Sequence, residues 1–127
     1  MAFEFLRSEN NASPIEKEIV ATNGTTYNHG CLVAYGASGT AVTSSTVAEF
    51  VYAGKTITAK TGDVLAVIPV LPEYEFETEF GANASALKAG AKVTVDGEKA
   101  TSTTTSGIFQ ILQDGGASGS KVVGRFA

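Results

Sequence analysis

The sequence is poor in the residue types that build most reactive sites. Its 127 residues include one cysteine, one histidine, one methionine and no tryptophan. A single cysteine cannot form a disulfide within the chain, so cysteine usage says nothing about the redox compartment. His29 and Cys31 could start a metal site only if remote carboxylates supplied the other ligands, and a cysteine packed as a small apolar side chain is the favoured interpretation. The sequence therefore predicts no catalytic, cofactor-binding or metal-binding residues.

Long apolar runs and dense positive charge are also missing. No stretch approaches the roughly 20 apolar residues that cross a bilayer. The first seven residues lack the basic and apolar regions of a signal peptide, so we expect synthesis in a cytoplasm. Nine Lys and Arg residues are spread along a chain of net charge −4, whereas proteins that bind nucleic acid concentrate them. Neither a membrane nor a nucleic acid is expected as a partner.

What the chain does contain is a series of short β-strand patterns separated by turn signals. Residues 74–80 alternate strictly between apolar and polar side chains, and residues 64–71 form a continuous apolar run typical of a strand buried on both faces. Pro69 marks an edge or a bend in that strand. Asn23-Gly24 and Asp96-Gly97 are strong signals for tight turns. Further strands are expected at residues 29–35, 47–53, 56–59, 92–95, 98–101, 107–112 and 121–126.

These patterns predict an all-β fold. Strands at intervals of about 8–12 residues favour a single compact barrel-like or sandwich-like domain, which we place at residues 21–127. One short helix is expected near residues 85–89, before Gly90.

Residues 1–20 differ from the rest and are expected to form an extended N-terminal arm. Phe3 and Phe5 alternate with polar neighbours, and a polar stretch closed by Pro14 follows them. Two interpretations stay open: a frayed terminus, or an arm whose Phe3 and Phe5 pack into a partner. In both, residues beyond the arm are expected to fold without it.

A row of carboxylates accompanies the clearest strand. Glu73, Glu75, Glu77 and Glu79 share one face of residues 73–80, about 6.5–7 Å apart along the strand. They could form a catalytic or metal site, a solvated face paired with Lys or Arg on a neighbouring strand, or an acidic stripe that meets another subunit. The solvated face is the favoured interpretation, and Glu75 and Glu77 are the candidates for partner contact.

From residue 20 onward, the order of motifs resembles that of the small decoration proteins of tailed bacteriophage heads. Those proteins open with N-G-T-x-Y-x-x-G, continue through A-L-x-x-G-x-x-V-x-V and a D-G turn, and close with K-V-x-x-R-F. The corresponding segments here are Asn23–Gly30, Ala86–Gly97 and Lys121–Phe126.

The resemblance implies a structural protein that stabilises a virion by docking on the outside of its head. Its partners would then be the major capsid protein and further copies of itself, as a homotrimer. The alternative is a non-catalytic β-rich adhesion or carbohydrate-binding module, which would normally present exposed Trp or Tyr rings, whereas this chain has four Tyr and no Trp. A trimeric β-class nucleotide hydrolase is a third possibility, but the phosphate-binding Ser and Arg motifs of that class are missing.

Overall fold

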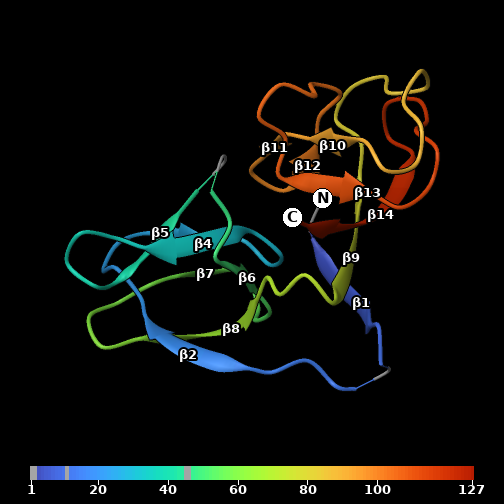
Figure 1. The fold of residues 1–127 in the computed structure, drawn as a ribbon. Coiled ribbons are helices and arrows are strands. Elements are labelled where there is room, and N and C mark those ends of the chain that lie inside the picture. Colours follow the sequence, from blue (N-terminus) through green and yellow to red (C-terminus); the bar gives the residue numbers. More distant parts are fainter. Residues whose placement is uncertain (1–2, 11, 45–46) are drawn as a thin grey trace.

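The computed structural model describes residues 3–10, 12–44 and 47–127 and shows two groups of strands lying side by side (Figure 1). The described residues contain β-strands and no helix, so the predicted all-β class is confirmed. We call the groups the first lobe and the second lobe. The chain passes between them twice, once after residue 10 and once at residues 70–73.

The first lobe is built from one continuous stretch of the chain. Five strands form an antiparallel sheet in the order β2-β8-β6-β4-β5, and β3 pairs with β7 beside it. A parallel bridge between Ala21 and Ala41 links the two edges of the five-stranded sheet, so the sheet curls around its core without forming a closed barrel. The bounds are β2 (Lys17–Val20), β3 (Thr26–Tyr27), β4 (Leu32–Tyr35), β5 (Ala41–Thr43), β6 (Phe50–Tyr52), β7 (Ile57–Thr58) and β8 (Val64–Pro69).

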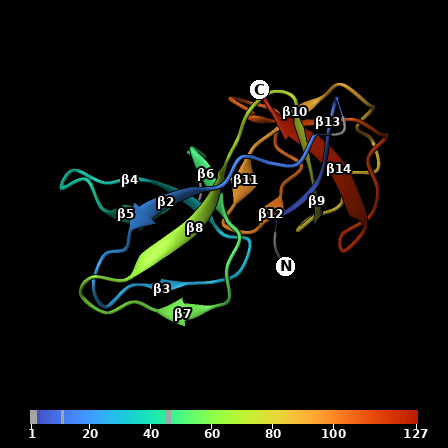
Figure 2. The ribbon, with the colours of Figure 1, turned by 90° about the horizontal axis from the view of Figure 1, so that it is seen from below.

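The second lobe joins the start of the chain to its last third. Its sheet has the order β1-β9-β14-β13-β10, with every neighbouring pair antiparallel. The hairpin β11–β12 lies on the side that faces the first lobe (Figure 2). The bounds are β1 (Glu4–Ser8), β9 (Tyr74–Glu79), β10 (Lys92–Val93), β11 (Val95–Asp96), β12 (Lys99–Ala100), β13 (Phe109–Ile111) and β14 (Lys121–Phe126).

The two lobes share a buried apolar cluster. Leu32, Val51 and Ile68 point outward from the curled sheet of the first lobe and pack against the core of the second lobe. Because alternate residues of a strand face opposite sides, the same strands can also fill the first lobe's own core, for example with Val33 and Val67. Burial of both faces fixes the lobes against each other.

The N-terminal segment is not an extended arm, contrary to the sequence-based expectation. Residues 4–8 form β1, which pairs with β9 at the edge of the second sheet, and residues 17–20 form β2 of the first lobe. Phe3 is 1% exposed and its ring lies 5.3 Å from the rings of both Phe109 and Phe126. An alternating aromatic segment adds equally well to a sheet edge of its own chain, which explains the difference.

The structure differs from several local predictions. Residues 85–89 lie in turns rather than in a helix. Only part of the apolar run at 64–71 is buried on both faces, since Val64 and Ala66 are exposed where β8 begins. Asp96-Gly97 does sit at a hairpin, but the two residues of the turn are Gly97 and Glu98, with a positive φ of 61° at Gly97. That placement suits a turn with glycine at its first central position.

Gly124 occupies a place in β14 where only glycine fits. A Cβ atom there would lie 2.6 Å from the carbonyl oxygen of Gln110 and 2.6 Å from the ring of Phe109. The missing side chain lets the Phe109 ring pack across the strand, next to Phe126. The glycine is therefore part of how the aromatic core closes.

The position of Phe3 gives a stability prediction. We expect Phe3→Ala to lower the free energy of unfolding by about 3–5 kcal/mol, because it empties a buried aromatic site. Leu6→Ala on the same strand is the control, since Leu6 is 39% exposed and its loss should cost under about 1 kcal/mol. Chemical denaturation measures both, and equal small effects would mean that Phe3 is not a core residue in solution.

Candidate functional site

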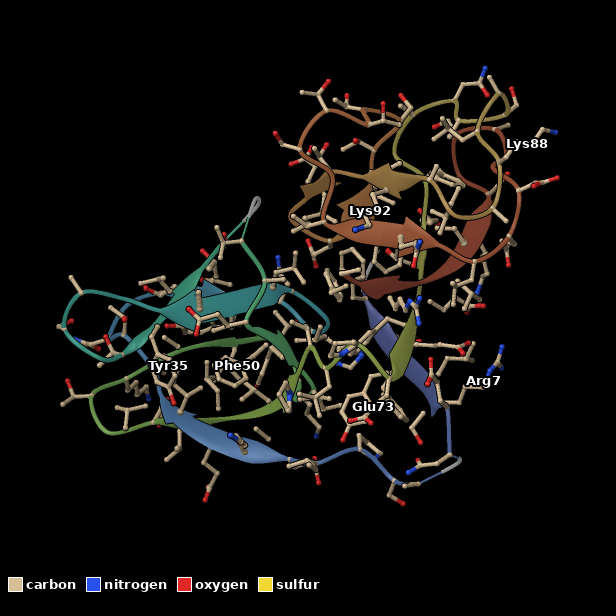
Figure 3. All side chains as sticks on the ribbon, in the orientation of Figure 1. Arg7, Tyr35, Phe50, Glu73, Lys88 and Lys92 are labelled. Atoms are coloured by element: carbon tan, nitrogen blue, oxygen red, sulfur yellow. The ribbon has the colours of Figure 1, made fainter. Side chains whose placement is uncertain are left out.

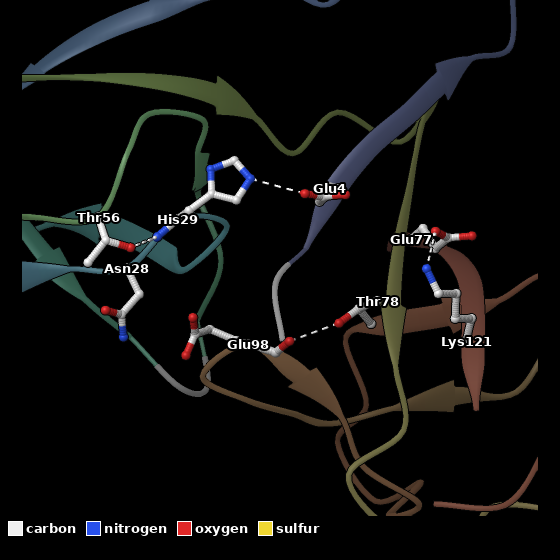
Figure 4. A pocket seen from close by; sticks show the side chains of 8 residues that line it. All are labelled: Glu4, Asn28, His29, Thr56, Glu77, Thr78, Glu98 and Lys121. Carbon is white, nitrogen blue, oxygen red and sulfur yellow. Dashed lines mark hydrogen bonds and ion pairs between the residues drawn. The ribbon is translucent and has the colours of Figure 1, made fainter. Parts of the chain in front are cut away.

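A polar cleft of about 330 Å³ lies between the two lobes and is the candidate functional site (Figure 4). Its walls come from β1, β9, the β11–β12 turn and β14 of the second lobe, and from the loops before β4 and β7 of the first. Eight residues line it: Glu4, Asn28, His29, Thr56, Glu77, Thr78, Glu98 and Lys121.

His29 is the side chain that joins the two walls of the cleft. Its backbone N–H donates to Oγ1 of Thr56 at 3.0 Å, which fixes the loop before β4. The ring nitrogen Nδ1 lies 2.8 Å from the carbonyl oxygen of Gly54, and Nε2 lies 3.1 Å from Oε1 of Glu4 on β1 (Figure 4). The Gly54 carbonyl and then the Glu4 carboxylate raise the pKa of His29 above its ordinary value.

The opposite part of the cleft is held by two further contacts. Thr78 is buried, and its hydroxyl donates to the carbonyl oxygen of Glu98 at 2.8 Å. Lys121 Nζ lies 3.6 Å from Oε1 of Glu77. The Glu98 side chain therefore projects from a hairpin turn that is anchored to β9.

The cleft does not gather metal ligands. Within residues 3–10, 12–44 and 47–127, no three His, Cys, Asp or Glu side chains converge as a metal ion would require. His29 and Cys31 also point apart: His29 is half-exposed in the cleft, whereas Cys31 is 6% exposed and packs in the core of the first lobe. The interpretation of Cys31 as a small apolar core residue is confirmed.

Burial also controls the chemistry of the Cys31 thiol. Burial first, and then the negative charge of Glu98, raises the pKa of Cys31 to about 11. Since only the thiolate reacts with alkylating agents, very little of the reactive form exists near neutral pH.

We expect Cys31 in the folded protein to react with iodoacetamide at pH 8 roughly 100-fold more slowly than in the denatured chain. Because it is the only thiol, mass spectrometry reads one site without ambiguity. Equal rates with and without denaturant would show that the thiol is accessible in the folded state.

The acidic strand has the face assignment that its alternation predicted. Tyr74, Phe76 and Thr78 of β9 are buried, and the intervening glutamates are partly exposed. Glu75 Oε1 lies 3.0 Å from Arg7 Nε on the neighbouring strand β1, as in the favoured interpretation of a solvated face with cations opposite. Arg7 projects from the outer edge of the second lobe (Figure 3). Glu73 lies outside the strand, in the turn before β9.

The predicted partner residues therefore have different surroundings. Phe3 is enclosed in the core, so its ring is not available to a partner. Phe5 is half-buried, with its ring edge-on to Tyr74 at 5.2 Å and to Phe76 at 5.9 Å. Glu75 and Glu77 are partly buried, with 18% and 35% of their side chains exposed, and each lies beside a cation of its own chain.

Two acidic residues of the cleft were not singled out from the sequence. Glu4 is placed opposite the two phenylalanines by the alternation of Phe3-Glu4-Phe5, so its exposure could have been predicted. Its partner His29 lies 25 residues away, and no local pattern joins the two. Glu98 was recognised only as part of a hairpin.

Neutralising the acidic face tests its contribution to stability. We expect the double change Glu75→Gln and Glu77→Gln to alter the free energy of unfolding by under about 1 kcal/mol, because each glutamate pairs with a largely exposed cation and such ion pairs contribute little. Thr78→Val on the same strand is the matched control and should cost about 1–3 kcal/mol, since it leaves the Glu98 carbonyl without its donor. Urea denaturation compares the variants, and a collapse of the double variant would contradict the face assignment.

In the part of the chain that the structure describes, no helix is long and apolar enough to span a bilayer. Comparison with models of known protein families gives no match, and comparison with curated protein sequences gives none at a significant level.

Proposed function

We propose that this protein is a non-catalytic structural protein that decorates and stabilises the head of a tailed bacteriophage. It would dock as a homotrimer on the outside of the shell formed by the major capsid protein. The observation that carries the proposal is where the three motifs fall in the fold: on the turns around β3, on the loop that leads into β10 and β11, and on β14. These elements together cover both lobes.

The motifs correspond to elements that a rigid scaffold needs. Asn23-Gly24 forms a tight turn, in which Gly24 has a φ of 84° and the Thr25 N–H donates to the carbonyl of Thr22. Gly97 turns the β11–β12 hairpin, and the residues of the closing motif form β14, the central strand of the second sheet. Such elements provide a fixed surface for docking, since little conformational entropy is lost when a rigid scaffold binds.

The state of the nucleophilic and basic groups also supports a binding role. Both ring nitrogens of His29 are held in contacts with this chain, and the Cys31 thiol is buried with a raised pKa. A nucleophilic mechanism needs a base within reach of a nucleophile, with a free nitrogen to accept the proton. His29 is not placed to act as such a base, and Cys31 is not placed to act as such a nucleophile.

The alternative of a carbohydrate-binding module has less support from the aromatic residues. Tyr27, Tyr52 and Tyr74 are buried. Tyr35 is 52% exposed, but it stands alone at the far end of the first lobe with its ring edge-on to Phe50 at 5.5 Å (Figure 3). A sugar-binding platform normally presents several rings on one face.

Capsid binding can be tested directly with undecorated heads. The heads are assembled from the major capsid protein encoded nearest to this chain in its genome, and binding is followed by co-sedimentation and negative-stain microscopy. We expect saturable binding at a fixed ratio to the capsid subunits, since a decoration protein occupies equivalent lattice sites. Binding should survive Cys31→Ala, which changes a core residue away from the surface.

The Glu75→Gln and Glu77→Gln double variant tells whether the acidic stripe contributes to docking. Weaker binding of that variant, together with weaker binding of the unmodified protein in high salt, would place the stripe in the interface. Absence of sedimentation with heads at any concentration of the unmodified protein would contradict the proposed function.

A further inference from the structure

The contact between His29 and Glu4 joins the two lobes through one titratable ring. His29 belongs to the first lobe and Glu4 to β1 of the second. We propose that His29 is a pH-sensitive latch. The doubly protonated imidazole donates to both the Glu4 carboxylate and the Gly54 carbonyl, and deprotonation breaks its contact with Glu4. The proposal does not depend on capsid binding.

The chemistry of the two partners requires two protons on the ring. The Gly54 carbonyl oxygen can only accept a hydrogen bond, and so can the ionised carboxylate of Glu4. A neutral imidazole carries one N–H and therefore satisfies one of them. With its proton on Nδ1, 2.8 Å from the Gly54 oxygen, the ring would turn the lone pair of Nε2 toward the carboxylate. Both contacts are favourable only for the imidazolium.

The charges around the ring also favour the protonated form. Three carboxylates line the same cleft, from Glu4 on β1, Glu77 on β9 and Glu98 in the β11–β12 turn. Among the residues that the structure describes, the one ammonium lining it is that of Lys121 on β14, which is beside Glu77. On the side of the first lobe, Cys31 is a neutral thiol in the physiological range, and the Tyr52 hydroxyl donates to the carbonyl of Lys55. The Gly54 carbonyl, and after it Glu4, raise the pKa of His29.

The latch lies beside a backbone contact between the lobes. The N–H of Phe3 donates to the carbonyl oxygen of Gly30 at 3.0 Å, and these residues adjoin Glu4 and His29 respectively. Glu4 and His29 also line a second groove of about 250 Å³, whose other lining residues are apolar or aromatic. The contact therefore belongs to the walls of both the polar cleft and this groove.

The direction of the pH dependence follows from the raised pKa. The contact is fully present below the ordinary histidine value of about 6.5, and it is lost as the pH rises through the higher value of the folded protein. Both side chains are half-exposed or more, so the effect on global stability is small and a local measurement is needed.

The first measurement is an NMR titration of the imidazole. The chain has one histidine, so a single ring signal reports the site. We expect a pKa above 6.5 in the unmodified protein, and Glu4→Gln should lower it by about 0.2–0.7 pH unit, the range of an exposed ion pair. Glu16→Gln, outside the cleft, is the matched control and should leave the titration unchanged. A pKa at or below 6.5, or one that Glu4→Gln does not lower, overturns the proposal.

The second measurement is hydrogen exchange at the amide of Phe3. We expect its protection factor to fall between about pH 5 and about pH 8 as His29 loses its proton. In Glu4→Gln the side-chain amide can donate to a neutral Nε2 as well as accept from a protonated one, so protection should no longer depend on pH. The same pH profile in both proteins would show that the ring titrates without acting as a latch.

Discussion

The arrangement of both lobes depends on a shared apolar interface built around the rings of Phe3, Phe109 and Phe126. Three strands of the first lobe would otherwise present Leu32, Val51 and Ile68 to water. Small sheets bury too little surface to be stable alone, so covering both faces of these strands contributes to each lobe. The position of the polar cleft follows, because it lies at the rim of this interface where side chains become polar.

Features with a local cause could be predicted from the sequence. The alternation along β9 assigned its buried and exposed faces, and the strand at 121–126 has the expected bounds. The turns at Gly24 and Gly97 follow from the freedom of glycine at positive φ. Residues 85–89 show the limit of such reasoning. Ala86 and Leu87 suit a helix, but the Leu87 N–H and carbonyl bond to Ala84 and Gly115 in a compact loop.

Features that depend on distant partners could not be predicted in the same way. Phe3-Glu4-Phe5 has the pattern of a strand that completes a sheet, and the pattern is the same whether that sheet belongs to this chain or to another. The candidate site could not be predicted from the sequence for the same reason. His29 reaches Glu4 and Gly54, each 25 residues away in opposite directions along the chain, and only the tertiary fold brings them together.

The order of the strands has a consequence for how the protein is made. The first lobe uses residues 17–69 without interruption, so all its sheet partners are present once that stretch has left the ribosome. The second sheet instead places β1 beside β9 and β9 beside β14. Its first strand therefore cannot pair until residues 74–79 are synthesised, and its central strand is absent until residues 121–126 are synthesised. During that interval the side chains of Phe3, Leu32 and Val51 are not buried by the second sheet. Exposed apolar strands of this kind favour association between chains, so the period before β14 is synthesised is when the nascent protein is most prone to aggregate.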